Sequence, residues 1–105
     1  VWLMGVPLSE TLASAELLGL KTALNEFVAY GALANIEPGI LSERSKLITL
    51  YALCGFANFS SVGILVSGIS AMAPERKNDL IKVSLKALIG ATLASCMTGL
   101  VIGIF

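Results

Sequence analysis

The chain has 105 residues, of which 56% are hydrophobic and 13% are charged, about half the charged share of an ordinary soluble domain. Seven basic residues balance seven acidic ones, and no basic run is interleaved with aromatic residues. This composition is typical of an integral membrane protein and excludes nucleic acid as a partner.

The N-terminal third of the sequence predicts a short apolar end and a hairpin. Residues 1–7, VWLMGVP, are interpreted as the end of a preceding membrane span, so we expect the chain to be truncated at its N-terminus. Residues 8–34 are apolar but carry a charge every five or six positions, at Glu10, Glu16, Lys21 and Glu26. A lipid-facing span would not tolerate these charges, so two short helices are predicted, folded back as a re-entrant hairpin shielded by protein.

A connector and an interrupted helix are predicted next. Residues 35–46, NIEPGILSERSK, contain Pro38-Gly39 as a turn and Ser42 as a helix N-cap. Residues 47–74 are uncharged for 28 positions, longer than a straight span requires, and weak helix formers cluster in their middle as CGFANFSSVG. The sequence therefore predicts a discontinuous transmembrane helix over 44–72, with its first half at 44–55 and its break near 56–60.

The last transmembrane helix is predicted at 76–105, because the final 19 residues carry no charge. One face has a small residue at every fourth position, at Ala87, Ala91, Ser95, Gly99 and Gly103. Such a face lets a neighbouring helix approach closely. The loop at 73–79 is predicted to be cytoplasmic, because three basic residues lie near it against two on the opposite side.

Glu26 is the residue that is hardest to explain as purely structural. A carboxylate among apolar neighbours must be neutralised, paired or given a polar ligand. One interpretation places Glu26 on a substrate or ion path, and the other pairs it with Lys21, although a spacing of five is poor for a helical pair. The adjacent Asn25 either caps the second hairpin helix or lies beside the substrate.

Asn58 and Ser61 form a second polar group, in the middle of the apolar stretch. An amide and a hydroxyl on one helix face together donate to and accept from vicinal hydroxyl groups, but hydrogen bonds between helices explain them equally well. Phe56 is interpreted as a packing residue or as a stacking surface for a ring. Cys54 and Cys96 are interpreted as small core residues, and the absence of histidine leaves no candidate metal site.

Two sequence blocks, KTALNEFVAY and YALCGFANFSSVGI, followed by MAPERKNDL, resemble the C-terminal part of the concentrative nucleoside transporter family. The resemblance covers essentially the whole chain and implies an all-α integral membrane fold, one of two inverted repeats of an elevator-type homotrimer in the cell membrane. It also implies that Glu26, Asn58 and Ser61 hydrogen-bond the ribose of a nucleoside, with Phe56 beside them. The nucleobase contacts and the sodium site would lie in the missing N-terminal repeat, so no ion site is assigned here.

Two classes of function are therefore considered. The first is a part of a nucleoside transporter coupled to Na⁺ or H⁺. The second is a non-transporting membrane fragment whose polar residues serve helix packing or assembly. An intramembrane enzyme using Glu26 is not supported, because no second acid, histidine or metal cluster accompanies it.

Overall fold

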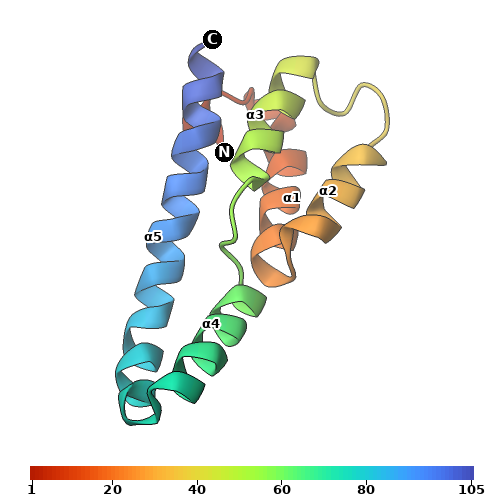
Figure 1. Cartoon of the computed structure of the whole chain (residues 1–105). Helices are drawn as coiled ribbons and strands as arrows, with labels where there is room; N and C mark the ends of the chain where they lie inside the picture. Colours follow the sequence, from red (N-terminus) through yellow and green to blue (C-terminus); the bar gives the residue numbers. More distant parts are fainter.

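The computed structural model describes all 105 residues and contains five α-helices and three 3₁₀ turns (Figure 1). The 3₁₀ turns are η1 (Trp2–Met4), η2 (Leu8–Glu10) and η3 (Pro74–Arg76). Helix α5 (Lys77–Ile104) runs along one side of the molecule, and the other helices lie beside it (Figure 1). Both ends of the chain lie toward the C-terminal half of α5 (Figure 1).

Helices α1 (Thr11–Ala23) and α2 (Glu26–Ala34) are the two short, folded-back helices expected in this part of the chain. They meet at a tip made of Leu24 and Asn25. Asn25 has an extended backbone, and its Oδ1 accepts a hydrogen bond from the Val28 amide at 3.0 Å. The prediction that Asn25 caps the second helix is confirmed.

The connector between α2 and α3 (Glu43–Leu53) contains both predicted features, a turn at Pro38-Gly39 and a helix N-cap at Ser42. Gly39 has a φ of +94° in the turn after Pro38, a conformation that favours glycine. Ser42 is the N-cap of α3, and its Oγ accepts a hydrogen bond from the Ser45 amide at 3.3 Å. Ser42 also donates its amide and hydroxyl to Glu10 Oε2, at 3.1 and 3.0 Å, which attaches α3 to the base of the hairpin.

The predicted interruption is present between α3 and α4 (Phe59–Met72). Helix α3 ends at Leu53, two residues earlier than the predicted limit of 55, and Asn58 starts α4 with φ −152° and ψ 168°. Residues 54–58 form an extended link that passes beside the middle of α5 (Figure 1). The break therefore begins slightly before the predicted 56–60, because glycine at position 55 weakens the helix just ahead of the cap.

The small-residue face of α5 is closely approached, as its spacing predicted, and the elements that approach it are α3 and the N-terminal turn. A Cβ built on Gly99 would lie 3.0 Å from the Ala52 side chain and 3.0 Å from the Ile48 carbonyl. A Cβ built on Gly103 would overlap the Met4 carbonyl. These glycines allow backbone-to-backbone approach that any side chain would prevent.

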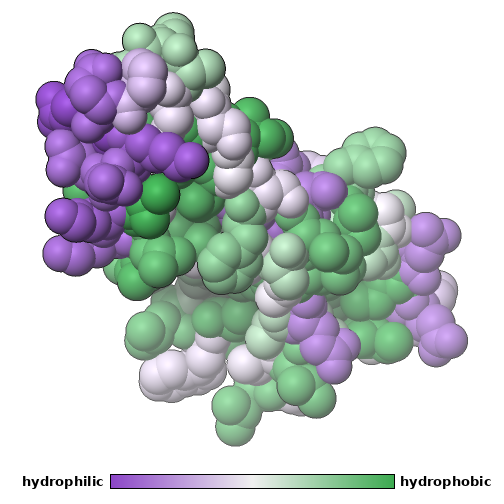
Figure 2. All heavy atoms as spheres, turned by 90° about the horizontal axis from the view of Figure 1, so that it is seen from below, coloured by the Kyte–Doolittle hydropathy of each residue, from purple (hydrophilic) through white to green (hydrophobic).

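Most of the large apolar side chains are exposed, since only 18 of the 105 residues are buried. Phe27 is 84% exposed and Met72 80% exposed, an amount of apolar surface that requires lipid or other protein to cover it. Residues 74–104 form the one helix long and apolar enough to cross a membrane. Figure 2 shows hydrophobic surface over much of the face seen from the α4–α5 turn, with the largest group of hydrophilic residues at one edge and smaller groups toward the opposite edge.

Cys54 was wrongly predicted as a core residue, since its side chain is exposed, whereas Cys96 is half-buried. Cys54 directly follows the last residue of α3, where the chain leaves the packed helix. Its apolar neighbours in the sequence therefore did not indicate its burial.

Candidate functional site

The hairpin tip meets the helix break through Glu26 and Asn58. Asn58 Nδ2 donates a hydrogen bond of 2.8 Å to Glu26 Oε2 across 32 positions of sequence. Glu26 is the first residue of α2 and is half-buried, whereas Asn58 is fully buried. The two predicted polar groups are thus brought into direct contact.

Ser61 is held by Asn58 in a reciprocal capping box at the start of α4. The Ser61 amide donates to Asn58 Oδ1 at 2.7 Å, and the Ser61 hydroxyl donates to the Asn58 carbonyl at 2.7 Å. The Asn58 amide in turn donates to Ser61 Oγ at 3.2 Å. The Ser61 hydroxyl is therefore already used within the chain, and Asn58 is the residue that links the cap to Glu26.

A second bond joins the tip to α4, and the sequence alone did not indicate it. Ser60 Oγ donates to the Leu24 carbonyl at 3.0 Å. Leu24 follows the last residue of α1, so this bond and the Glu26–Asn58 bond fasten both sides of the tip to the first turn of α4. The only available signal was that Ser60 is a hydroxyl residue within the stretch of weak helix formers that predicted the break.

The predicted alternative of a salt bridge between Glu26 and Lys21 is wrong. The two salt bridges present are exposed pairs within single helical turns, Lys46–Glu43 and Arg76–Asp79. Lys21 instead donates from Nζ to the Ala52 carbonyl at 3.1 Å. Glu26 is thus left with Asn58 as its hydrogen-bond partner.

The negative charge of Glu26 lies near the N-terminal end of α4, which has a partial charge of opposite sign. A helix N-terminus carries a partial positive charge from its free amides, which favours a nearby carboxylate. Glu26 is connected to that end through Asn58, the N-cap residue. A half-buried carboxylate with one amide partner has further lone pairs to accept hydroxyl donors.

An apolar groove of about 210 Å³ lies between α4 and α5 next to this site. Phe56, Ala57 and Ser61 line one end, and 11 of the 13 lining residues are hydrophobic. Glu26 and Asn58 do not line it. Phe56 is 57% exposed, so its ring is free to contact a partner at the mouth of the groove.

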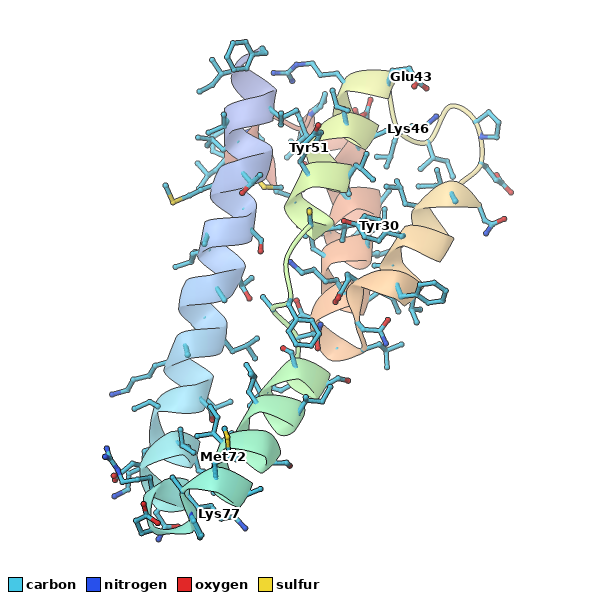
Figure 3. All side chains as sticks on the ribbon, viewed as in Figure 1. Tyr30, Glu43, Lys46, Tyr51, Met72 and Lys77 are labelled. Atoms are coloured by element: carbon cyan, nitrogen blue, oxygen red, sulfur yellow. The ribbon has the colours of Figure 1, made fainter.

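Tyr30 and three charged residues, Glu43, Lys46 and Lys77, are not part of the contact between Glu26 and Asn58 (Figure 3). Tyr30 points from α2 toward the end of α3 and packs against a buried apolar cluster around Leu17 and Leu53 (Figure 3). Lys46 and Glu43 lie at the start of α3, and Lys77 lies at the opposite end of the molecule (Figure 3).

The whole chain is similar to known proteins of one kind. Residues 1–103 match the protein family described as "Na+ dependent nucleoside transporter C-terminus". Nucleoside permease NupC of Helicobacter pylori is 40% identical over 108 residues, which are 99% of this chain and 26% of that protein. Sodium/nucleoside cotransporter 1 of Mus musculus is 41% identical over 117 residues, which are 98% of this chain and 18% of that protein.

A solved structure has the same fold. The structure of CNTnw in an inward-facing, substrate-bound state superimposes with a TM-score of 0.88 at 40% sequence identity. The superposition covers 97% of this chain and 25% of that one. The chain thus spans about a quarter or less of the length of the proteins that it matches.

Proposed function

The chain belongs to the concentrative nucleoside transporter family, as its C-terminal region, and on this premise we propose that it supplies the ribose-binding half of the substrate site in a cation-coupled nucleoside transporter. The matched relatives are named as a permease and a cotransporter, so the chain is part of a membrane transporter rather than an enzyme. The family expected from the two sequence blocks is confirmed.

The observation that carries the proposal is the 2.8 Å bond between Glu26 Oε2 and Asn58 Nδ2. A ribose diol needs acceptors for two hydroxyl protons and a donor for an oxygen lone pair. Glu26 supplies the acceptors, the Asn58 amide supplies a second N–H, and hydrogen bonds to a charged group are about twice as strong as neutral ones. Ser61 supports Asn58 through the capping box, and Phe56 and Asn25 lie next to the sugar.

The rest of the chain has a consistent place in this proposal. Residues 1–7 end a preceding scaffold helix, 8–34 form a re-entrant hairpin and 35–46 the connector. Residues 44–72 form the discontinuous transmembrane helix and 76–105 the last transmembrane helix. Together they form one of two inverted repeats that move as an elevator, and the N-terminal repeat completes the site. Broken helices whose freed backbone groups line a midplane site are characteristic of such transporters.

The surroundings of the transporter are part of the same proposal. The assembly is a homotrimer in the cell membrane, with the loop at 73–79 in the cytoplasm. Exposed residues such as Phe27 and Met72 support burial against lipid or other protein. The transporter is a symporter, and its coupling ion is Na⁺ or H⁺, held outside this chain; the name of the mouse relative favours Na⁺.

The proposal is tested in the full-length parent by replacing Glu26 with glutamine. Uptake of labelled uridine is measured against concentration, at matched surface expression. Glu16→Gln is the matched control, because Glu16 is an exposed acid of the same hairpin. We expect Glu26→Gln to raise the uridine concentration at half-maximal uptake about tenfold or more, as a charged partner of the diol is lost, and Glu16→Gln to leave it unchanged. Wild-type concentration dependence in Glu26→Gln would contradict the proposal.

A non-transporting fragment is not favoured as the function. Its polar residues would serve only to join helices, whereas the similarity to transporters extends over 97–99% of the chain. The Glu26→Gln experiment also separates these two functions, because a purely structural role predicts loss of folded protein rather than weaker uptake by normally expressed protein.

A further inference from the structure

Lys21 is the largest fully buried side chain of the molecule, with 1% of its surface exposed. It lies on α1, one turn before the hairpin tip. A buried amine is costly unless it has a hydrogen-bond partner. The proposed ribose site does not contain Lys21, so its position requires an explanation.

The Lys21 amine takes the place of a missing backbone amide at the helix break. Its Nζ donates to the Ala52 carbonyl at 3.1 Å. In an unbroken helix this carbonyl would accept from the amide of residue 56, but α3 ends at Leu53 and no backbone amide bonds to Ala52. Lys21 therefore satisfies an acceptor that exists only because the helix is interrupted.

The hairpin is bonded to both sides of the break. On one side, Lys21 is bonded to the end of α3. On the other side, the Leu24 carbonyl accepts from Ser60 Oγ at 3.0 Å, and Glu26 accepts from Asn58 at 2.8 Å, both at the start of α4. The extended link joins the two half-helices along the chain, and the hairpin joins them a second time through these side chains.

Lys21 makes the last of three attachments along the contact between α1 and α3. At the base of the hairpin, Glu10 Oε2 accepts from the Ser42 hydroxyl at 3.0 Å. Further along, Thr49 Oγ1 donates to Ser14 Oγ at 2.9 Å, and both residues are fully buried. Lys21 lies seven residues after Ser14, about two helical turns nearer the tip. Of the three attachments, only that of Lys21 lies at the break.

The surroundings of the Lys21 amine leave the Ala52 carbonyl no other partner. Ala52 is fully buried, so its carbonyl does not reach bulk water. A Cβ built on Gly55 would lie 3.6 Å from Lys21 Nζ and would overlap Ser95 Oγ of α5, so the link and α5 enclose the amine. Loss of the Lys21 donor would therefore leave a buried carbonyl unpaired, at the full cost of its desolvation.

We propose that Lys21 is a positioning residue of the substrate site, whose bond to Ala52 fixes the end of α3 to the hairpin and so keeps Glu26 at bonding distance from Asn58. This inference rests on the proposed function of Glu26. No salt bridge joins Lys21 and Glu26, so Lys21 acts through the position of the hairpin. The role requires an N–H donor at the end of a long side chain, and a neutral amine and an ammonium both supply one.

The test uses Lys21→Met in the full-length transporter, because methionine is a long, unbranched side chain without an N–H donor. Ser14→Ala is the matched control, since it removes a buried hydrogen bond between the same two helices, away from the break. Calorimetry gives the number of binding sites and the affinities for uridine and 2′,3′-dideoxyuridine in wild type, both variants and Glu26→Gln.

We expect Lys21→Met to bind uridine about tenfold more weakly, with an unchanged number of sites and a reduced preference for uridine over the dideoxynucleoside. Ser14→Ala should keep the wild-type affinity and preference. A purely structural Lys21 would instead lower the number of sites, as less protein folds, and leave the preference of the remaining sites unchanged.

The outcomes separate the two proposals. Wild-type affinity and preference in Lys21→Met, or equal losses in Lys21→Met and Ser14→Ala, together with weak binding by Glu26→Gln, would overturn the role of Lys21 and leave the ribose site intact. Wild-type preference in Glu26→Gln would overturn both proposals.

Hydrogen exchange of the wild-type transporter decides the matter if Lys21→Met does not fold. A hairpin that holds both sides of the break should open together with it, so the amides of residues 22–28 and 54–61 should have the same free energy of opening. Different free energies of opening for the two segments would refute the role of Lys21.

Discussion

Asn58 allows helix capping and substrate binding to be separated, because its two side-chain atoms have different partners. Oδ1 accepts from the Ser61 amide at 2.7 Å and caps α4, whereas Nδ2 donates to Glu26 at 2.8 Å. In Asn58→Ser, the hydroxyl replaces the cap and leaves Glu26 without its amide donor. Asn58→Ala removes both interactions. The two variants therefore share the loss at Glu26 and differ only in the cap.

The expected magnitudes follow from these bonds. Loss of an N-cap costs about 1 kcal/mol, so Asn58→Ala should be less thermostable than Asn58→Ser by an effect of that size. The second N–H of the Asn58 amide makes a neutral hydrogen bond to the ribose in this proposal, of about 0.5–1.5 kcal/mol, so both variants should bind uridine about 2- to 12-fold more weakly than wild type. Stability should thus distinguish the variants, and affinity should not.

The assay combines thermal unfolding and equilibrium uridine binding on the same preparations of the full-length transporter. Serine is a capping residue comparable to asparagine, so Asn58→Ser serves as the folded reference for Asn58→Ala. Wild-type uridine affinity in Asn58→Ser would refute the reasoning, because Asn58 would then be a cap and nothing more.

Three further predictions concern packing and the tip. Gly99→Ala should lower the free energy of unfolding by about 1–3 kcal/mol, because the new Cβ would lie 3.0 Å from atoms of α3. Gly90→Ala is the control and should be neutral or stabilising, because a Cβ at Gly90 would have no atom within 4 Å. Equal effects of the two substitutions in a thermal melt would contradict the packing of α5 against α3. Glu26→Gln should weaken uridine uptake more than Ser61→Ala, whose hydroxyl is used in the cap, and equal losses at matched surface expression would count against the charge of Glu26. Ser60→Ala removes one neutral bond to the tip, of about 0.5–1.5 kcal/mol, and should weaken uridine binding less than tenfold; a larger loss in calorimetry would mean that Ser60 itself contacts the substrate.

The helix break and the two helix caps were predictable from the sequence, because each depends on residues within about one helical turn. The weak helix formers around Asn58 predicted the break, and Asn25 and Ser42 were predicted as caps, because capping depends on residues within one turn. The break begins before its predicted start, since a glycine and a following cap residue together end α3 at Leu53. The close approach of another element to α5 was predicted from the spacing of its small residues.

Long-range features were not predictable from the same patterns. The partner of Lys21 is a carbonyl 31 positions away that is free only because a helix ends there, and no spacing rule contains this information. The Ser60–Leu24 bond joins residues 36 positions apart, and no spacing rule predicts this bond either. The small-residue face of α5 indicated contact but not that α3 and the N-terminal turn would provide it.

The central claim is that Glu26, held by Asn58, binds the ribose hydroxyls, and comparison of uridine with 2′,3′-dideoxyuridine tests it most directly. The affinities of both nucleosides are measured by calorimetry for the full-length transporter and for its Glu26→Gln variant. We expect wild type to prefer uridine by at least about tenfold, and the preference to shrink markedly in Glu26→Gln, because the charge-assisted bonds to the diol are lost. If Glu26→Gln weakens both nucleosides by the same factor, Glu26 does not bind the ribose hydroxyls and the account is wrong.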